Sequence, residues 1–143
     1  AESGADEIHI GLNDLHIEYK MKFMFELLAN GKVDEICEKI KPLGIPYGFG
    51  GIAGLDEGGL LPGRIVIAEH YRLGSSMAIL SRSFYNASIE KDVDEMEAVF
   101  SKGMRDIRAY EEYLAEAPVS FFENNRAEVK KRVTDIVQKL TWV

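Results

Sequence analysis

Residues 47–80, YGFGGIAGLDEGGLLPGRIVIAEHYRLGSSMAIL, decide the fold class of this chain. The glycine-dense apolar stretch over 47–52 predicts a strand, and Pro62 and Gly74 are well placed to begin and end a helix after it. The continuous apolar run 77–80 then predicts a second strand that is covered on both faces. A strand, a helix and a strand in this order predict parallel strands joined by a right-handed crossover.

The segments on either side extend this pattern. Alternating apolar residues over 8–12 predict a further strand, and apolar residues at helical spacing predict helices over 19–28 and 33–40. Towards the other end of the chain, the spacing predicts a long amphipathic helix from Val93 and a last helix after Pro118. Strands and helices therefore alternate along the chain, which indicates an α/β fold.

The composition is that of a globular domain. The 143 residues are 46% apolar and carry a formal net charge of −7, and a chain of this length buries about two-thirds of its unfolded surface without needing cross-links. The acidic balance argues against a nucleic acid or an anionic membrane as partner, because counterion release needs a basic face. With one cysteine, Cys37, and no apolar stretch of membrane-spanning length, we expect a reducing, cytoplasmic setting.

Residues suited to chemistry follow or end each predicted strand, and in parallel α/β folds such strand ends carry the functional residues. Asp14 is either a ligand for a hard divalent metal or a turn aspartate that caps the next helix. Gly50 and Gly51 either let the backbone approach a ligand closely or relieve crowding. Arg82 either holds a carboxylate or phosphate or belongs to a structural ion pair.

Two other short segments resemble functional sequence motifs. Residues 48–53 match the spacing of the GxGxxA dinucleotide fingerprint, but the glycines after them and Pro62 postpone the helix that this motif needs. Residues 69–72, Glu-His-Tyr-Arg, occupy successive helix positions and point in different directions, so we do not expect them to converge on one ligand.

The strand-end motifs together resemble those of the HpcH/HpaI class II aldolase and citrate lyase beta-subunit family, which belongs to the pyruvate and phosphoenolpyruvate TIM barrels. Residues 8–15, IHIGLNDL, are similar to the IGxNDL motif of the family's sixth strand. Residues 47–84, with GFGGIAGL, EHYRLGSS and ILSRSF, look like the seventh and eighth strands. The resemblance implies the carboxyl-terminal part of a TIM (β/α)8 barrel, about strands six to eight, with 1–143 as one partial-barrel domain and 92–143 as its helical extension.

The resemblance also implies a divalent-metal-dependent aldolase or lyase that acts on a 2-keto acid through a pyruvate enolate. Asp14 would ligate Mg²⁺ or Mn²⁺. The residues implied to bind substrate are Asn13, Leu15, Gly50, Gly51 and Arg82. The family's glutamate ligand and its catalytic histidine and arginine precede the sixth strand, so we expect this chain to supply part of a site and to form a homo-oligomer.

Two other functions stay open at this point. The chain could be a non-catalytic fragment or half-barrel module whose role is assembly. It could also be a phosphate-binding α/β domain that uses its glycine-rich loop without a metal.

Overall fold

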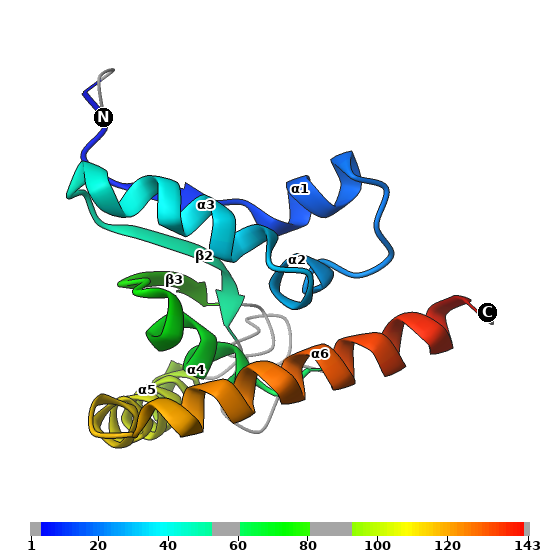
Figure 1. Ribbon diagram of the computed structural model, residues 1–143. Coiled ribbons are helices and arrows are strands. Elements are labelled where there is room, and N and C mark those ends of the chain that lie inside the picture. The colour runs from blue at the N-terminus through cyan, green and yellow to red at the C-terminus, as the bar shows by residue number, and fades with distance from the viewer. Residues whose placement is uncertain (1–3, 53–60, 81–92, 142–143) are drawn as a thin grey trace.

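The described part of the chain contains a small parallel sheet among many helices (Figure 1). The structure is a computed structural model that describes residues 4–52, 61–80 and 93–141. Its three strands are β1 (Ile8–Ile10), β2 (Tyr47–Ile52) and β3 (Met77–Leu80), in the order β1-β2-β3. Both pairings are parallel, as the sequence predicts.

The helices fall between and after the strands. Between β1 and β2 lie α1 (Leu12–Glu18), α2 (Glu26–Ala29), α3 (Lys32–Ile40) and the 3-10 helix η1 (Lys41–Leu43); α4 (Gly63–Leu73) precedes β3; α5 (Val93–Ala115) and α6 (Val119–Thr141) follow it. The predicted bounds of α4 are confirmed, because the helix starts after Pro62 and ends at Gly74, which has a φ of +75°. The predicted helix over 33–40 is also confirmed as α3.

The single helix predicted over 19–28 is wrong. The chain forms the short helices α1 and α2 instead, separated by a turn in which Lys20 has a φ of +56°. The carboxylate of Glu26 accepts hydrogen bonds from the amides of Lys22 at 2.8 Å and Phe23 at 2.9 Å. These side-chain bonds to the backbone hold the turn and compete with a continuous helix.

The prediction that β3 is covered on both faces is wrong as well. In the described sheet β3 is an edge strand, and its central Ile79 is 60% exposed. The other residues of β3, Met77, Ala78 and Leu80, are half-buried and line a cavity against α4 and α5.

The prediction of a partial TIM barrel is corrected by the same architecture. The described residues form a mostly helical α/β unit with a small three-stranded sheet. A (β/α) barrel places one helix after each strand, whereas the crossover from β1 to β2 carries α1, α2 and α3. Helix α6 follows all three strands in sequence and packs against the much earlier helices α2 and α4.

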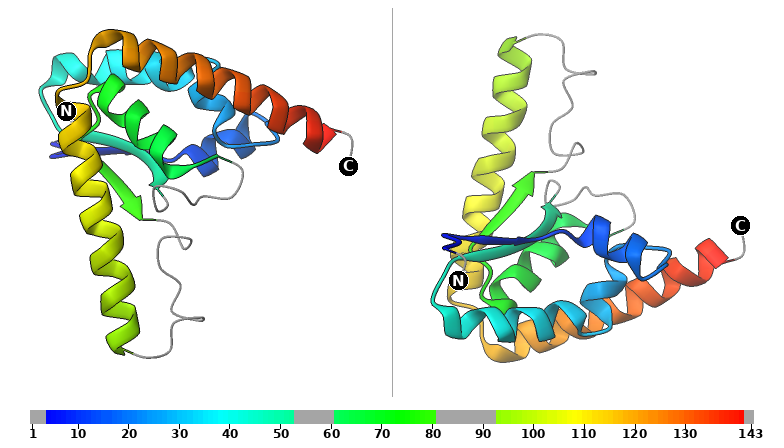
Figure 2. Two further views of the ribbon diagram at one scale, coloured as in Figure 1. Left: turned by 90° about the horizontal axis from the view of Figure 1, so that it is seen from below. Right: turned by 90° about the horizontal axis from the view of Figure 1, so that it is seen from above.

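The packed helices form one layer against the sheet. Figure 2 shows α3, α4 and α6 on the same side of the strands, with the first half of α5 extending away from them. The largest fully buried side chains come from β2, from α1, α2 and α5, and from the residues just before α4: Phe49, Leu12, Leu27, Leu28, Leu114 and Leu61. The core therefore lies between β2 and the helices.

Gly48 sets how closely β2 approaches β3. A Cβ atom at this position would lie 2.0 Å from the carbonyl oxygen of Met77, which pairs with Gly48 in the sheet. Backbone cannot yield to a contact of that length without a shift of the strand. Only glycine therefore fits this position.

We expect Gly48→Ala to lower the free energy of unfolding by at least about 2 kcal/mol, because overpacking at a backbone contact strains the strand pair. Urea denaturation measures the change. Gly11→Ala is the matched control, since a Cβ there meets the Asp14 carboxylate at an ordinary 3.4 Å. Equal effects of the two substitutions would contradict this account.

Candidate functional site

The predicted site at the end of β1 lies on the first turn of α1. Gly11 is the N-cap of this helix, with no side-chain cap, and Leu12 is fully buried. Asn13 and Asp14 are exposed. Asp14 therefore does not cap the helix, and its carboxylate is open to solvent at the carboxyl end of a parallel strand.

The two neighbours of Asp14 differ in what they can offer a ligand. The amide of Leu15 already donates to the carbonyl oxygen of Gly11 at 3.0 Å. The first amides of a helix have no intrahelical acceptor, so the amide of Asn13 remains available for a ligand. The carbonyl oxygen of Asn13 accepts a hydrogen bond from Nδ1 of His16.

Packing accounts for the glycines at the end of β2. Gly50 has a φ of +56°, in the region that favours glycine, and a Cβ there would lie 3.0 Å from Leu12 Cδ1. Its carbonyl oxygen accepts from Nε2 of His9 at 3.3 Å, which ties β1 to β2. Gly51 is half-buried in the same strand. Arg82, the remaining predicted site residue, lies outside the described residues.

The metal prediction can be tested against the donors near Asp14. A carboxylate oxygen suits Mg²⁺ or Mn²⁺, but among residues 4–52, 61–80 and 93–141 no group of three or more histidine, cysteine or acidic side chains could hold a metal ion. Glu18 lies one helical turn further along α1 and is exposed. In the described part of the chain, Asp14 is thus one possible metal ligand, and a complete metal site would need further ligands.

Residues 69–72 separate into two structural clusters, as the helix geometry predicts. The first, called the charge cluster here, consists of Asp34, Glu69, Arg72 and Arg126. Arg72 donates from Nε to Glu69 and from its two Nη atoms to both oxygens of Asp34, at 2.8 and 3.0 Å. Nη2 of Arg126 lies 3.5 Å from Asp34. The four charges cancel and connect α3, α4 and α6.

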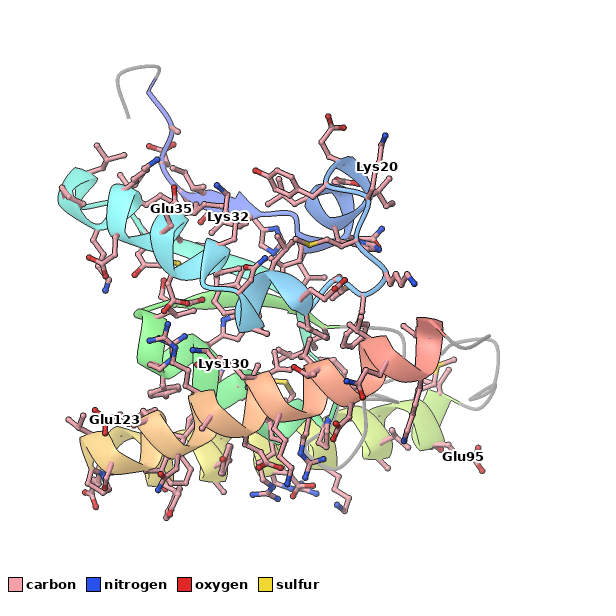
Figure 3. The ribbon with its side chains drawn as sticks, turned by 45° about the vertical axis from the view of Figure 1, so that its right-hand side comes forward. Lys20, Lys32, Glu35, Glu95, Glu123 and Lys130 are labelled. Carbon is pink, nitrogen blue, oxygen red and sulfur yellow. The ribbon has the colours of Figure 1, made fainter. Side chains whose placement is uncertain are left out.

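The charge cluster is less exposed than the surface pairs, although its outer member, Arg126, is 41% exposed. Glu69 is 0% exposed, whereas Lys32 and Glu35 lie side by side on the surface of α3 (Figure 3), 3.6 Å apart. Burial raises the pKa of Glu69, and the hydrogen bond from Arg72 offsets part of that rise. Burial acts in the same direction on Asp34, but the hydrogen bond and charge of Arg72 outweigh it and lower its pKa.

The second cluster surrounds His70. Its ring stacks on Phe49 with 3.9 Å between centroids, and its Nδ1 lies 2.6 Å from the hydroxyl oxygen of Ser75. That hydroxyl donates to the carbonyl oxygen of Met77 at 3.1 Å, so Nδ1 carries the proton in the bond to Ser75. Burial lowers the pKa of His70 to about 4, with a smaller contribution from His9. His70 is therefore neutral at pH 7.

The structure also contains a cavity that the sequence did not predict. It has a volume of about 430 Å³ and lies between β3, α4 and α5. Tyr71, Arg108 and Glu111 contribute polar groups to its lining. From sequence, Arg108 and Glu111 are an ordinary charged pair one helical turn apart, and no local pattern shows that a cavity lies beside them.

Comparison of the chain with models of protein families, with curated proteins and with solved structures finds no match. The resemblance to the aldolase family stays a prediction that rests on the motifs quoted above. Within the ranges that the structure describes, no helix combines the length and apolar character needed to cross a membrane.

We expect Arg72→Met to lower the free energy of unfolding by about 3 kcal/mol, because it leaves the carboxylates of Glu69 and Asp34 buried without their main partner. Arg132→Met is the control, since it removes a guanidinium from the exposed pair with Glu128 on α6 and such pairs contribute under about 1 kcal/mol. Chemical denaturation of both variants measures the difference. Similar losses in both would contradict a structural role for the charge cluster.

The lowered pKa of His70 predicts how stability depends on pH. The folded state binds fewer protons than the unfolded state between pH 6.5, the ordinary pKa, and about 4, the folded pKa. Stability therefore falls through this window as the pH falls, by about 3 kcal/mol in total for this group.

Unfolding free energies measured across this window should fall less steeply for His70→Gln than for the unchanged protein. His16→Gln replaces a half-buried histidine on α1 and serves as the control. A pH profile that is the same for His70→Gln and the unchanged protein would contradict the assignment.

Proposed function

We propose that this chain supplies part of the active site of a divalent-metal-dependent aldolase or lyase that acts on a small 2-keto acid. The observation that supports the proposal is the place of Asp14, an exposed carboxylate just after the carboxyl end of β1 in a parallel sheet. The IHIGLNDL motif around it resembles the metal-binding motif of the aldolase family.

We assign a role to each group of the proposed site from the residues near Asp14. A bound Mg²⁺ or Mn²⁺ would supply Lewis-acid stabilisation of the pyruvate enolate. Asp14 would bind the ion, and the amide of Asn13 would donate a hydrogen bond to a substrate carboxylate. The proposal gives no role to the charge cluster, which joins α3, α4 and α6, or to His70, which is buried.

We further propose that the chain forms a homo-oligomer through the edges of its sheet. Both outer edges of the described sheet, on β1 and β3, present strand backbone that pairs with no other described strand, and exposed edges are templates for pairing with another chain. A homo-oligomer in a cytoplasmic setting is therefore part of the proposal.

A non-catalytic assembly module is the second candidate. It is favoured by the shortage of metal-ligating side chains around Asp14 in the described ranges. The phosphate-binding alternative stays a prediction, because residues 53–60 of the glycine-rich loop lie outside the described residues. Packing explains the close contacts of Gly48 and Gly50 in β2.

The two candidates predict different results in thermal unfolding with Mn²⁺ and oxalate, an analogue of the pyruvate enolate. For the proposed enzyme, the pair of ligands at about 100 times their dissociation constant stabilises the fold by about 2.7 kcal/mol, and Asp14→Asn abolishes the shift. Glu18→Gln, on the same helix, is the matched control and should keep it. The absence of any shift in the unchanged chain would contradict the proposal and favour the assembly module.

A further inference from the structure

The cavity between β3, α4 and α5 is separate from the strand end that carries Asp14. Asp14 follows β1, at one edge of the described sheet, whereas the cavity lies against β3, at the other edge. Its volume of about 430 Å³ falls within the range of about 300 to 1,000 Å³ that is typical of small-molecule sites. The proposed lyase chemistry leaves this cavity without a role.

The walls of the cavity are mainly apolar. They are lined by Ile52, Ile67, Leu80, Met104 and Ile107. His70 and Ser75 also line it and share the hydrogen bond at 2.6 Å, whereas Nε2 of His70 is buried without a hydrogen-bond partner. Since His70 is neutral at pH 7, the interior carries no charge and suits an apolar group.

Both charged side chains in the lining come from neighbouring turns of α5. Nη1 of Arg108 donates to the two carboxylate oxygens of Glu111 at 2.9 and 3.1 Å, and the side chains are 66% and 28% exposed. Burial raises the pKa of Tyr71, with a further rise from Glu111 and a small opposing effect from Arg108. The hydroxyl of Tyr71 on α4 therefore lies within electrostatic range of Arg108 and Glu111.

We propose that this cavity binds an α-amino acid with an apolar side chain. The carboxylate of the ligand pairs with Arg108, its ammonium group pairs with Glu111, and its side chain lies between the apolar walls. Adjacent opposite charges match a zwitterion, because Glu111 repels a simple carboxylate and Arg108 repels a simple amine.

Arg108 and Glu111, which we call the mouth of the cavity, would have to leave each other to pair with the ligand. General physical principles favour this exchange. An exposed pair three residues apart on a helix contributes little to stability, so opening it costs little. Each charged side chain regains a charge-assisted hydrogen bond with the ligand, and the apolar group of the ligand leaves water.

Calorimetric titration with L-phenylalanine tests the proposal. The comparison ligands are 3-phenylpropanoate and 2-phenylethylamine, each of which keeps the ring and lacks one of the two charges. We expect both to bind at least about tenfold more weakly than phenylalanine, the change that one charge-assisted bond accounts for. Undetectable binding of phenylalanine, or equal binding of all three, would overturn the proposal.

Variants at the mouth give the second measurement. Arg108→Gln and Glu111→Gln should each weaken phenylalanine binding by about tenfold, and both positions are on the surface of α5, where the fold tolerates glutamine. Arg132→Gln, in the exposed pair on α6, should leave the affinity unchanged. Binding that survives both mouth variants would place phenylalanine elsewhere. Asp14→Asn separates this proposal from the lyase, since it should not change phenylalanine binding.

Discussion

The arrangement of the helices over the sheet depends on the partly buried charge cluster of Asp34, Glu69, Arg72 and Arg126. Removing charged groups from water costs several kcal/mol for each ion, and this cost is tolerated only where partners are placed accurately. Arg72 meets that condition for both oxygens of Asp34 and for one oxygen of Glu69, whose Oε1 is buried without a hydrogen-bond partner. Any other rotation of α4 would bury a carboxylate without its partner, so the cluster selects one arrangement of α3, α4 and α6.

The rotation of α4 then fixes the groups that face the sheet. Glu69, His70 and Arg72 lie on the same helix, so the rotation that places Arg72 against Asp34 of α3 also brings His70 onto Phe49. Tyr47 adds a second constraint, because its hydroxyl donates to the carbonyl oxygen of Leu73 at the end of α4. Helix α4 thus carries the buried Glu69 on one side and the contact with β2 on another. The space left between α4 and α5 beside β3 is the cavity.

Local patterns predicted the parts of the fold that local forces determine. The apolar spacing over 33–40 predicted one stripe of Val33, Ile36, Cys37 and Ile40, and all of these but the half-buried Ile36 are buried in α3. Gly74 ended α4 because glycine adopts its backbone conformation without strain. The course of α6 across α2 and α4 has no local signal, since it follows from contacts between residues far apart in sequence. The partial-barrel prediction failed for that reason, and so did the expectation that Ile79 is covered.

The same distinction applies to the sites. Asp14 could be placed at a strand end from sequence because strand and motif are contiguous, whereas its remaining partners depend on distant chain. Arg108 with Glu111 and Arg132 with Glu128 are both exposed ion pairs within one helix, and nothing in the sequence distinguishes them. They differ in what lies beside them, because only the first pair borders the cavity against β3. A charged pair becomes a candidate binding site through the tertiary packing next to it, which is why the structure was needed to find this one.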